Sequence, residues 1–406
     1  IDRHWYAGRG VRRLDRYEMP GTLPPAVVTG DTPALITFTT GTTGQPKAAV
    51  RSHGLLWAQH HALAEHLRLH EGDVDMPTLP IFVLNNLALG VTTVLPEFDP
   101  RRPAAIDPAA ILAQMRRHGV TTTSGSPAFY ARMAEWCRRR GQRLDVRLWT
   151  GGAPVYPRLA AELDAVTGGK AHVVYGSTEA EPIAGIEAAE LVRTSRAQGP
   201  PGEGDDEKRR SAVPGLCAGF PVPAVSVRII RVSDGPVRLG EDGWDELLLP
   251  VGETGEIVVT GDHVIGEYLH APGETARHKI RDGERVWHRT GDGGYLDGSG
   301  RLWLMGRLST RVKRNGETWW STPAELRALS VDAVGHAAYL GYPDASGCEQ
   351  AVLCVEADPT RASVERIRAA LHPFPVDEIR FLPRIPRDPR HASKTDVDGL
   401  RRLLAS

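Results

Sequence analysis

The most informative stretch of the chain is an apolar strand that continues directly into a loop of threonines and glycines, ALITFTTGTTGQPK at positions 34–47. Gly41 and Gly44 let the backbone curl, so that successive N–H groups face one concavity and can hold an anion. Lys47 adds a positive charge, and four hydroxyls add further donors, those of Thr39, Thr40, Thr42 and Thr43. The Walker A pattern GxxxxGK[ST] does not fit. A plain surface turn is the alternative, but the density of donors predicts a loop that binds polyphosphate.

The pattern after this loop is that of an α/β fold. Apolar strand candidates alternate with segments of helical periodicity, which is typical of a largely parallel sheet covered by helices. The predicted strands are 34–38, 48–51, 121–124, 147–150 and 172–175, and the predicted helices are 55–70, 109–118, 127–139 and 157–166.

The pattern changes twice further along the chain. Short strands at 225–232, 255–260, 286–289 and 301–305 predict a β-rich subdomain appended to the α/β core. Residues 195–211 are rich in glycine, proline and charge and predict a mobile surface loop.

A third region begins after Arg307. The capping-box spacing of Thr322 and Glu325, with Pro323 between them, predicts that a helix starts at Thr322. Together with this helix, a compact α+β unit is predicted from strands at 337–341, 351–356 and 378–382 and a helix at 364–371.

Composition limits the class of protein. The 406 residues carry 49 basic and 50 acidic side chains, and a net charge of −1 gives no field that attracts nucleic acid or an anionic membrane. Four cysteines without a CxxC pair predict a reducing, cytoplasmic compartment, and the first residues lack a signal-peptide pattern. The uncharged stretch 76–96 contains prolines and asparagines, which predict buried chain of a soluble core rather than a transmembrane segment.

Two residue types need separate comment. Lysine is scarce, with six among the 49 basic residues, so each lysine raises the question of why a compact ammonium stands there in place of arginine. Histidine is concentrated on the predicted helix 55–70, where His66 and His70 have the i,i+4 spacing of metal ligands. No third ligand accompanies them, so histidines on a helix surface are predicted rather than a metal site.

The loop at 39–47 resembles the signature loop of the adenylate-forming superfamily, which comprises acyl-CoA synthetases, luciferases and nonribosomal adenylation domains. Further motifs similar to those of the superfamily follow in the same order. They are Gly151-Gly152-Ala153-Pro154 (the adenine-side turn), Tyr175-Gly176-Ser177-Thr178-Glu179 (YGxTE), Thr290-Gly291-Asp292 (TGD) and Gly306-Arg307 (the arginine before the interdomain hinge).

The resemblance implies that ATP and Mg²⁺ are bound. Thr178 would contact phosphate, Glu179 would hold Mg²⁺, and Asp292 and Arg307 would hold the ribose. A carboxylate such as Glu179 beside a phosphate loop needs a divalent cation between them, because like charges repel. The remaining nucleotide contacts implied by the resemblance come from Thr39, Thr40, Gly41, Thr42, Thr43, Gly44, Lys47, Gly151, Gly152, Ala153, Tyr175 and Gly176.

The resemblance also implies two domains. It places the hinge near Ser309, between an N-terminal adenylation domain at 1–308 and a C-terminal domain at 309–406. Lys394, in Ser393-Lys394-Thr395, matches the catalytic lysine, and Lys313 matches a lysine just past the hinge. Relatives carry a large subdomain before the phosphate loop, so this chain is expected to be a naturally short gene product, a fragment, or a protein completed by another polypeptide.

The resemblance places part of the substrate pocket at residues 79–86, where amino-acid-activating relatives carry an aspartate. This stretch, LPIFVLNN, offers no carboxylate to pair with an α-amino group, which favours a non-amino carboxylic acid. Residues 79–90, 287–292 and 388–394 resemble the corresponding segments of the β-lactone synthetases of bacterial olefin and β-lactone biosynthesis.

The function implied by these resemblances is ATP-dependent activation of a small carboxylic acid, expected to be a β-hydroxy acid, as acyl-AMP with release of pyrophosphate. Thr178 and Glu179 would assist Lys394 in this step, and intramolecular β-lactone formation is expected to follow. Two alternatives remain open: an acyl-CoA ligase that transfers the acyl group to CoA or a carrier thiol, and a nucleotide-binding subunit without turnover.

Overall fold

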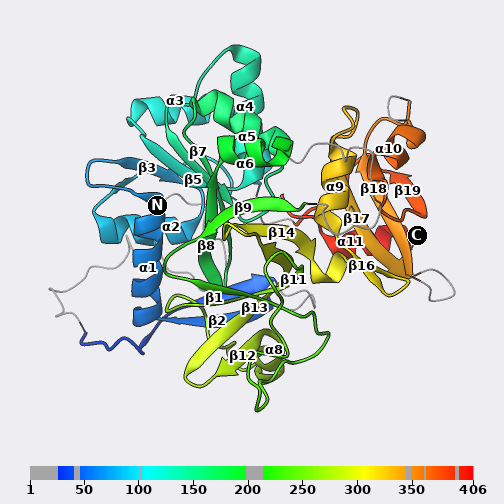
Figure 1. The fold of residues 1–406 in the computed structure, drawn as a ribbon. Coiled ribbons are helices and arrows are strands. Elements are labelled where there is room, and N and C mark those ends of the chain that lie inside the picture. Colours follow the sequence, from blue (N-terminus) through cyan, green and yellow to red (C-terminus); the bar gives the residue numbers. More distant parts are fainter. Residues whose placement is uncertain are drawn as a thin grey trace.

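A computed structural model of the chain describes residues 26–40, 46–100, 102–197, 214–343, 349–360, 363–388 and 393–405. The ribbon shows a large unit that contains most of the chain and a smaller unit formed by the C-terminal part (Figure 1). Strands and helices are combined in both units, and the predicted α/β class is confirmed.

One mixed sheet runs through the large unit. Within the described residues its strand order is β10-β11-β13-β14-β9-β8-β7-β6-β5-β3-β4, with β12 paired to β13. The parallel half consists of β3 (Val74–Pro77), β4 (Thr92–Thr93), β5 (Thr122–Gly125), β6 (Arg147–Gly151) and β7 (Ala171–Ser177). The antiparallel half consists of β8 (Ala180–Glu187), β9 (Leu216–Pro221), β10 (Ser226–Ile230), β11 (Gly255–Thr260), β12 (Lys279–Asp282), β13 (Arg285–Leu296) and β14 (Leu302–Arg307). The predicted β-rich region is therefore a continuation of the same sheet.

Helices cover both faces of the parallel half. Successive residues of a strand point to opposite faces, so Leu148 packs in the core with α3, α4 and α5, whereas Trp149 packs with α1 and α2. The helices are α1 (His53–Leu67), α2 (Pro80–Leu89), α3 (Pro108–Arg117), α4 (Pro127–Arg140), α5 (Pro157–Thr167) and α6 (Ala188–Ala197), with a 3₁₀ turn η2 at Pro103–Ala105. The end of α6 contains the first residues of the predicted loop 195–211, and residues 198–211 lie outside the described part of the chain.

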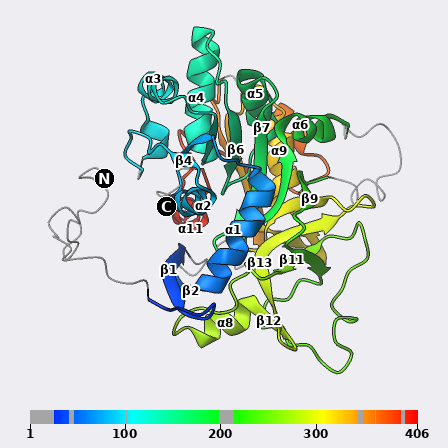
Figure 2. The same cartoon turned by 90° about the vertical axis from the view of Figure 1, so that its left-hand side faces the viewer.

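The first two predicted strands do not belong to this sheet. β1 (Pro33–Thr40) and β2 (Pro46–Ser52) pair antiparallel as a separate hairpin, in which Thr39 is opposite Lys47. The connection between them is too short for the crossover that parallel strands require. The predicted phosphate loop is therefore the part of the chain that connects these two strands, and the two strands lie beside one end of α1 (Figure 2).

The stretch 76–96 is only partly buried, contrary to the prediction. α2 buries Phe82, Asn85 and Asn86, but Leu84 and Leu87 on its other side are 46% and 70% exposed. Among the described residues, every helix is too short or too polar to cross a lipid bilayer.

The C-terminal unit has its own three-stranded sheet and its own core. A 3₁₀ turn, η3 (Leu308–Thr310), connects it to β14, so a hinge at Ser309 stays a prediction of the sequence. Its elements are β15 (Val312–Arg314), β16 (Glu317–Trp319), α9 (Ser321–Leu329), β17 (His336–Pro343), β18 (Glu349–Glu356), α10 (Val364–Leu371), β19 (Glu378–Phe381) and α11 (Val397–Leu404).

The predicted capping box of α9 is wrong. The helix begins at Ser321, and its N-cap residue Trp320 makes no side-chain cap hydrogen bond. Glu325 is instead turned toward the large unit, where its Oε2 accepts a hydrogen bond from the Tyr156 hydroxyl at 2.5 Å. The carboxylate thus serves the contact between the two units rather than the start of the helix.

Candidate active site

A cleft of about 1740 Å³ lies between the large unit and the C-terminal unit. It is lined by residues from both units, including α4, α5 and α9. Among its lining residues are seven that the sequence predicted for the site, Gly152, Ala153, Tyr175, Gly176, Asp292, Arg307 and Lys394.

Asp292 is the centre of the polar contacts in this cleft. Its Oδ2 accepts a hydrogen bond from the Tyr175 hydroxyl, and its Oδ1 is 2.8 Å from Nη1 of Arg307. The charge of Asp292 raises the pKa of Arg307, which stays a cation. Three predicted motifs thus meet at one carboxylate, whose remaining lone pairs can accept two hydroxyl donors of a ribose.

The turn after β6 brings backbone close to this point. A Cβ on Gly151 would lie 2.5 Å from the carbonyl oxygen of Val174, so only glycine permits the approach of β6 to β7. Gly152 follows with φ of +85° and lines the cleft together with Ala153. The predicted adenine-side turn therefore forms one wall.

Lys394 reaches the cleft from the C-terminal unit. Burial and the charge of Arg307 lower its pKa, and Asp292 opposes this shift. Its neighbour Ser393 accepts a hydrogen bond at Oγ from the backbone N–H of Ala128, in the first turn of α4. Lys313 lies elsewhere, because its Nζ is 2.9 Å from Asp234 and its side chain is half exposed.

A second group of polar side chains surrounds Glu179. The carboxylate accepts a hydrogen bond from the Tyr268 hydroxyl at 2.8 Å. Burial would raise the pKa of Glu179, but the nearby His288, this hydrogen bond and Lys279 together outweigh it, and the pKa falls to about 2. Glu179 is therefore ionised over the whole physiological range.

Lys47 lies in the same group. Its Nζ is 2.8 Å from Nε2 of His278 and 2.9 Å from the Glu274 carboxylate, and both partners belong to α8 (Pro272–His278). Burial and the charge of Lys47 lower the pKa of His278 to about 4, so the imidazole is neutral and accepts a hydrogen bond from Lys47. The ammonium also lies 5.0 Å from the centre of the Tyr268 ring.

The rest of the predicted phosphate loop is only partly described. Gly41, Thr42, Thr43 and Gly44 lie outside the described residues. Thr39 is buried, and its hydroxyl has no hydrogen-bond partner among the described residues. Thr40 pairs through its backbone with Pro46, and the carbonyl of Thr178 accepts a hydrogen bond from Arg51 at 2.5 Å.

Several residues of this group were missed by the sequence reasoning. Lys279 is 5% exposed, and burial lowers its pKa to about 7. Arg51 is also buried and donates to Gln59 at 2.7 Å. The scarcity of lysine was a signal that could have identified Lys279, whereas nothing in the pattern distinguished Tyr268 or the residues of α8.

Glu179 fits a hard divalent cation. Mg²⁺ is usually bound through one or two carboxylates together with phosphate oxygens and water, and Glu179 supplies one ionised carboxylate. In the part of the chain that the structure describes, no group of three or more histidine, cysteine or acidic side chains could form an all-protein metal cage.

Comparisons with known proteins agree with this geometry. Residues 6–269 match the model of a family described as AMP-binding enzyme. An olefin beta-lactone synthetase from Stenotrophomonas maltophilia is 35% identical over 97% of this chain and 71% of its own length, and an indoleacetate–CoA ligase from Aromatoleum aromaticum is 32% identical over 92% and 68%. Among solved structures, the ATP-bound MatB from Rhodopseudomonas palustris superposes with a TM-score of 0.71 at 26% identity, covering 93% of this chain and 69% of that one.

Proposed function

Since the chain belongs to the family of AMP-binding enzymes, we propose that it activates a β-hydroxy carboxylic acid with ATP and then closes the product to a β-lactone. The observation that carries the proposal is the meeting of Tyr175, Asp292 and Arg307 with Lys394 in one cleft. Tyr175, Asp292 and Arg307 offer the hydrogen-bonding groups that can bind a nucleoside. Lys394 offers a positive charge for the phosphate and the carboxylate that react.

The first step is adenylation. A carboxylate oxygen of the acid attacks the α-phosphorus of ATP, the bond from that phosphorus to the β-phosphate oxygen breaks, and pyrophosphate leaves. Lys394 lies where an ammonium can neutralise the charge that builds on the carboxylate and the α-phosphate. Asp292 and Arg307 hold the ribose, so catalysis consists of positioning and charge neutralisation.

The phosphate end is assigned to the second group. Lys47 would hold the β- and γ-phosphates, together with the hydroxyl of Thr178. Glu179 would hold Mg²⁺, which supplies positive charge next to these phosphates when it is bound. The low pKa of Glu179 supports this role, because a protonated carboxyl is a poor ligand.

The second step is closure of the lactone ring. The β-hydroxyl oxygen forms a bond to the acyl carbon, the bond to the AMP oxygen breaks, and the hydroxyl proton is released. Because the hydroxyl is tethered to the same molecule, the reaction gains effective concentration and needs no thiol acceptor. The 35% identity to an olefin beta-lactone synthetase supports this choice.

An acyl-CoA ligase is the second candidate. Indoleacetate–CoA ligase is 32% identical over 92% of this chain, which favours a thiol acceptor in the same cleft. This candidate shares the adenylation step and differs only in the group that attacks acyl-AMP.

The test has two parts. Pyrophosphate exchange into ATP that depends on a β-hydroxy acid would support adenylation, and its absence with acids of several chain lengths would contradict the proposal. Mass spectrometry of reactions with and without CoA then separates the two candidates. We expect AMP, pyrophosphate and a β-lactone without CoA, whereas a CoA thioester without lactone would assign the chain to the acyl-CoA ligases.

A further inference from the structure

Asp234 of the large unit binds two cations of the segment that follows the predicted hinge. One carboxylate oxygen is 2.9 Å from Nζ of Lys313, and the other forms an ion pair with Arg311. Both cations come directly after η3, and Arg311 also donates to the carbonyl of Leu308 at 3.0 Å. We call Asp234 with Arg311 and Lys313 the hinge clamp.

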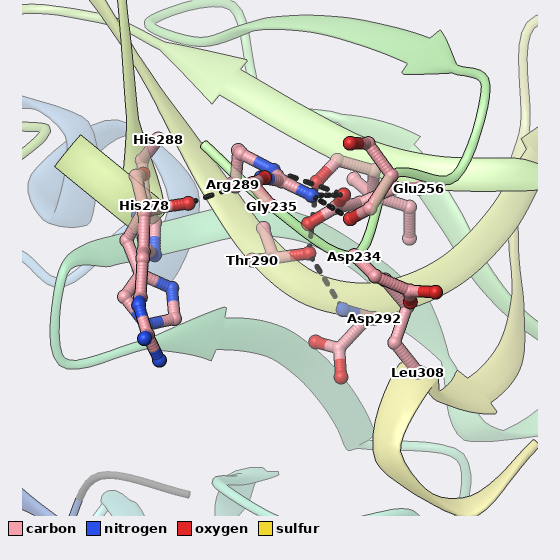
Figure 3. A network of polar contacts seen from close by, with 12 residues as sticks. Asp234, Gly235, Glu256, His278, His288, Arg289, Thr290, Asp292 and Leu308 are labelled. Atoms are coloured by element: carbon pink, nitrogen blue, oxygen red, sulfur yellow. Dashed lines mark hydrogen bonds and ion pairs between the residues drawn. The ribbon is translucent and has the colours of Figure 1, made fainter. Parts of the chain in front are cut away.

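A buried arginine, Arg289, holds the loop that carries Asp234. Nη1 of Arg289 donates to the carbonyl of Gly235 at 2.5 Å, and Nη2 donates to the carbonyl of Ser233 at 2.7 Å. Figure 3 shows this fork of contacts, with Asp234 and Leu308 on the side away from the histidines. The residues on both sides of Asp234 are thus fixed, so little conformational entropy remains to be lost when it binds the cations.

Arg289 is itself rigid. Its guanidinium is 5% exposed and makes two hydrogen bonds, of 3.0 and 2.6 Å, to one carboxylate oxygen of buried Glu256. Planar guanidinium groups suit such fixed, multiple contacts. The loop that carries Asp234 is therefore anchored, through Arg289 and Glu256, to the buried interior of the sheet.

The same arginine adjoins both halves of the site. Arg289 directly precedes Thr290-Gly291-Asp292, and its Nη1 also donates at 3.1 Å to the carbonyl of Arg277, in the helix whose Glu274 and His278 contact Lys47. The position of Asp234 is thus built into the same framework that places the residues for ribose and phosphate (Figure 3).

From this arrangement we propose that Asp234 is a positioning residue, which holds the C-terminal unit in the orientation where Lys394 reaches the cleft. The hinge clamp acts at the connection itself, so a small change of angle there moves Lys394 by a large distance. The role in turnover rests on the proposed function, whereas the role in orientation does not.

The size of the effect follows from the exposure of the clamp. The side chains of Asp234 and Lys313 are 70% and 53% exposed, and exposed ion pairs are weak. Arg311 is 9% exposed and adds a better shielded contact. We therefore expect loss of the clamp to increase the population of displaced orientations by about threefold to tenfold.

Hydrogen exchange of the Ala128 amide measures this population directly. First-turn N–H groups of a helix lack an acceptor in the helix, and this one donates to Ser393 of the other unit at 3.0 Å. Its protection therefore reports contact between the units, and its exchange rate rises in proportion to the displaced population. Peptides that contain Ala128 are followed by mass spectrometry in the whole protein.

Asp234→Asn, Asp234→Lys and Asp234→Glu form the test series, and Glu246→Gln, on another exposed part of the same connection between β10 and β11, is the matched control. We expect exchange at Ala128 to accelerate by about threefold to tenfold in Asp234→Asn and more in Asp234→Lys, while Asp234→Glu and the control resemble the parent protein. Arg289 is left intact, because its removal would leave Glu256 buried without a partner and could unfold the protein.

The rate of turnover is the second measurement. In ATP–pyrophosphate exchange, we expect Asp234→Lys to lower kcat by about threefold or more with an unchanged KM for ATP, since the nucleotide residues lie in the large unit. Unchanged protection of Ala128 in both the Asn and Lys variants, or an equal loss in the control, would overturn the proposal. So would turnover at the parent level in an Asp234 variant whose Ala128 amide has lost most of its protection. If the parent protein itself shows no acid-dependent exchange, the proposed function fails, and the protection of Ala128 still decides whether Asp234 sets the orientation.

Discussion

The two units of the molecule contribute to the cleft in opposite ways. The large unit supplies a set of side chains that hold one another and that we assign to the nucleotide, such as Tyr175, Asp292 and Arg307. The C-terminal unit supplies Lys394, a single ammonium whose place depends on contacts across the boundary such as that of Ser393 with Ala128. A preorganised set suits binding, whereas one group on a separate unit can be present in one step and withdrawn in the next. This difference supports the proposal that the large unit binds the nucleotide and that the C-terminal unit supplies the catalytic group.

Replacing Lys394 by alanine tests the catalytic half of this division and should have the largest effect. In the proposed mechanism the ammonium neutralises charge that develops mainly in the transition state, so we expect adenylation to fall by about 10²-fold or more while ATP still binds. Acid-dependent ATP–pyrophosphate exchange and equilibrium binding of ATP are the two measurements.

The matched control for this variant is Lys170→Ala. Lys170 pairs with Asp145 on the surface, and its side chain is 47% exposed. We expect the Lys170→Ala variant to keep the parent rates of ATP–pyrophosphate exchange and the parent affinity for ATP. Near-normal adenylation in Lys394→Ala would mean that the C-terminal unit does not carry the catalytic group.

Replacing Asp292 by asparagine tests the binding half. The amide keeps the shape of the side chain but loses the charge opposite Arg307 and one acceptor for the Tyr175 hydroxyl. Hydrogen bonds to charged groups contribute about 1.5–3 kcal/mol, so we expect ATP to bind about 10- to 100-fold more weakly. A loss confined to kcat, with normal ATP binding, would contradict the assignment of Asp292 to the nucleotide.

The sequence predicts the motif residues of the site better than it predicts their partners, and the reason is physical. Motif residues such as Asp292 and Lys394 could be named as candidates because the segments around them resemble motifs of the adenylate-forming superfamily. The partners that tune them could not, because Tyr268 and Glu274 are ordinary residues that only folding brings to Glu179 and Lys47. Local patterns can predict an element but do not show its partners.

Two elements show the limits of local patterns. The strands 34–38 and 48–51 have the apolar pattern of core strands, yet a short connection makes them a hairpin outside the main sheet. Glu325 has the spacing of a capping box, but its place at the boundary between the units decides its role, because a partly buried carboxylate needs a hydrogen-bond donor wherever one is found. The length of the connection overrode the local pattern in the first case, and a tertiary contact overrode it in the second.

Glu325 provides a further test of the boundary, with the smallest expected effect. Burial raises its pKa to about 7, although hydrogen bonds from the Tyr156 hydroxyl and the Tyr339 N–H oppose the shift. Because this pKa lies above the ordinary value of 4.5, the folded arrangement binds a proton that the unfolded chain releases. Its contribution to stability is complete below the ordinary pKa and is lost as the pH rises through about 7.

Between about pH 6 and pH 8 this linkage should lower the free energy of unfolding by about 1 kcal/mol. Glu325→Gln cannot titrate, so the difference in stability between the two pH values should be smaller in this variant by the same amount. Urea unfolding of both proteins at the two pH values measures the difference, in which the contributions of all other titrating groups cancel. An identical pH dependence in the two proteins would show that Glu325 is not buried against Tyr156 in solution, and that the two units do not meet at this point.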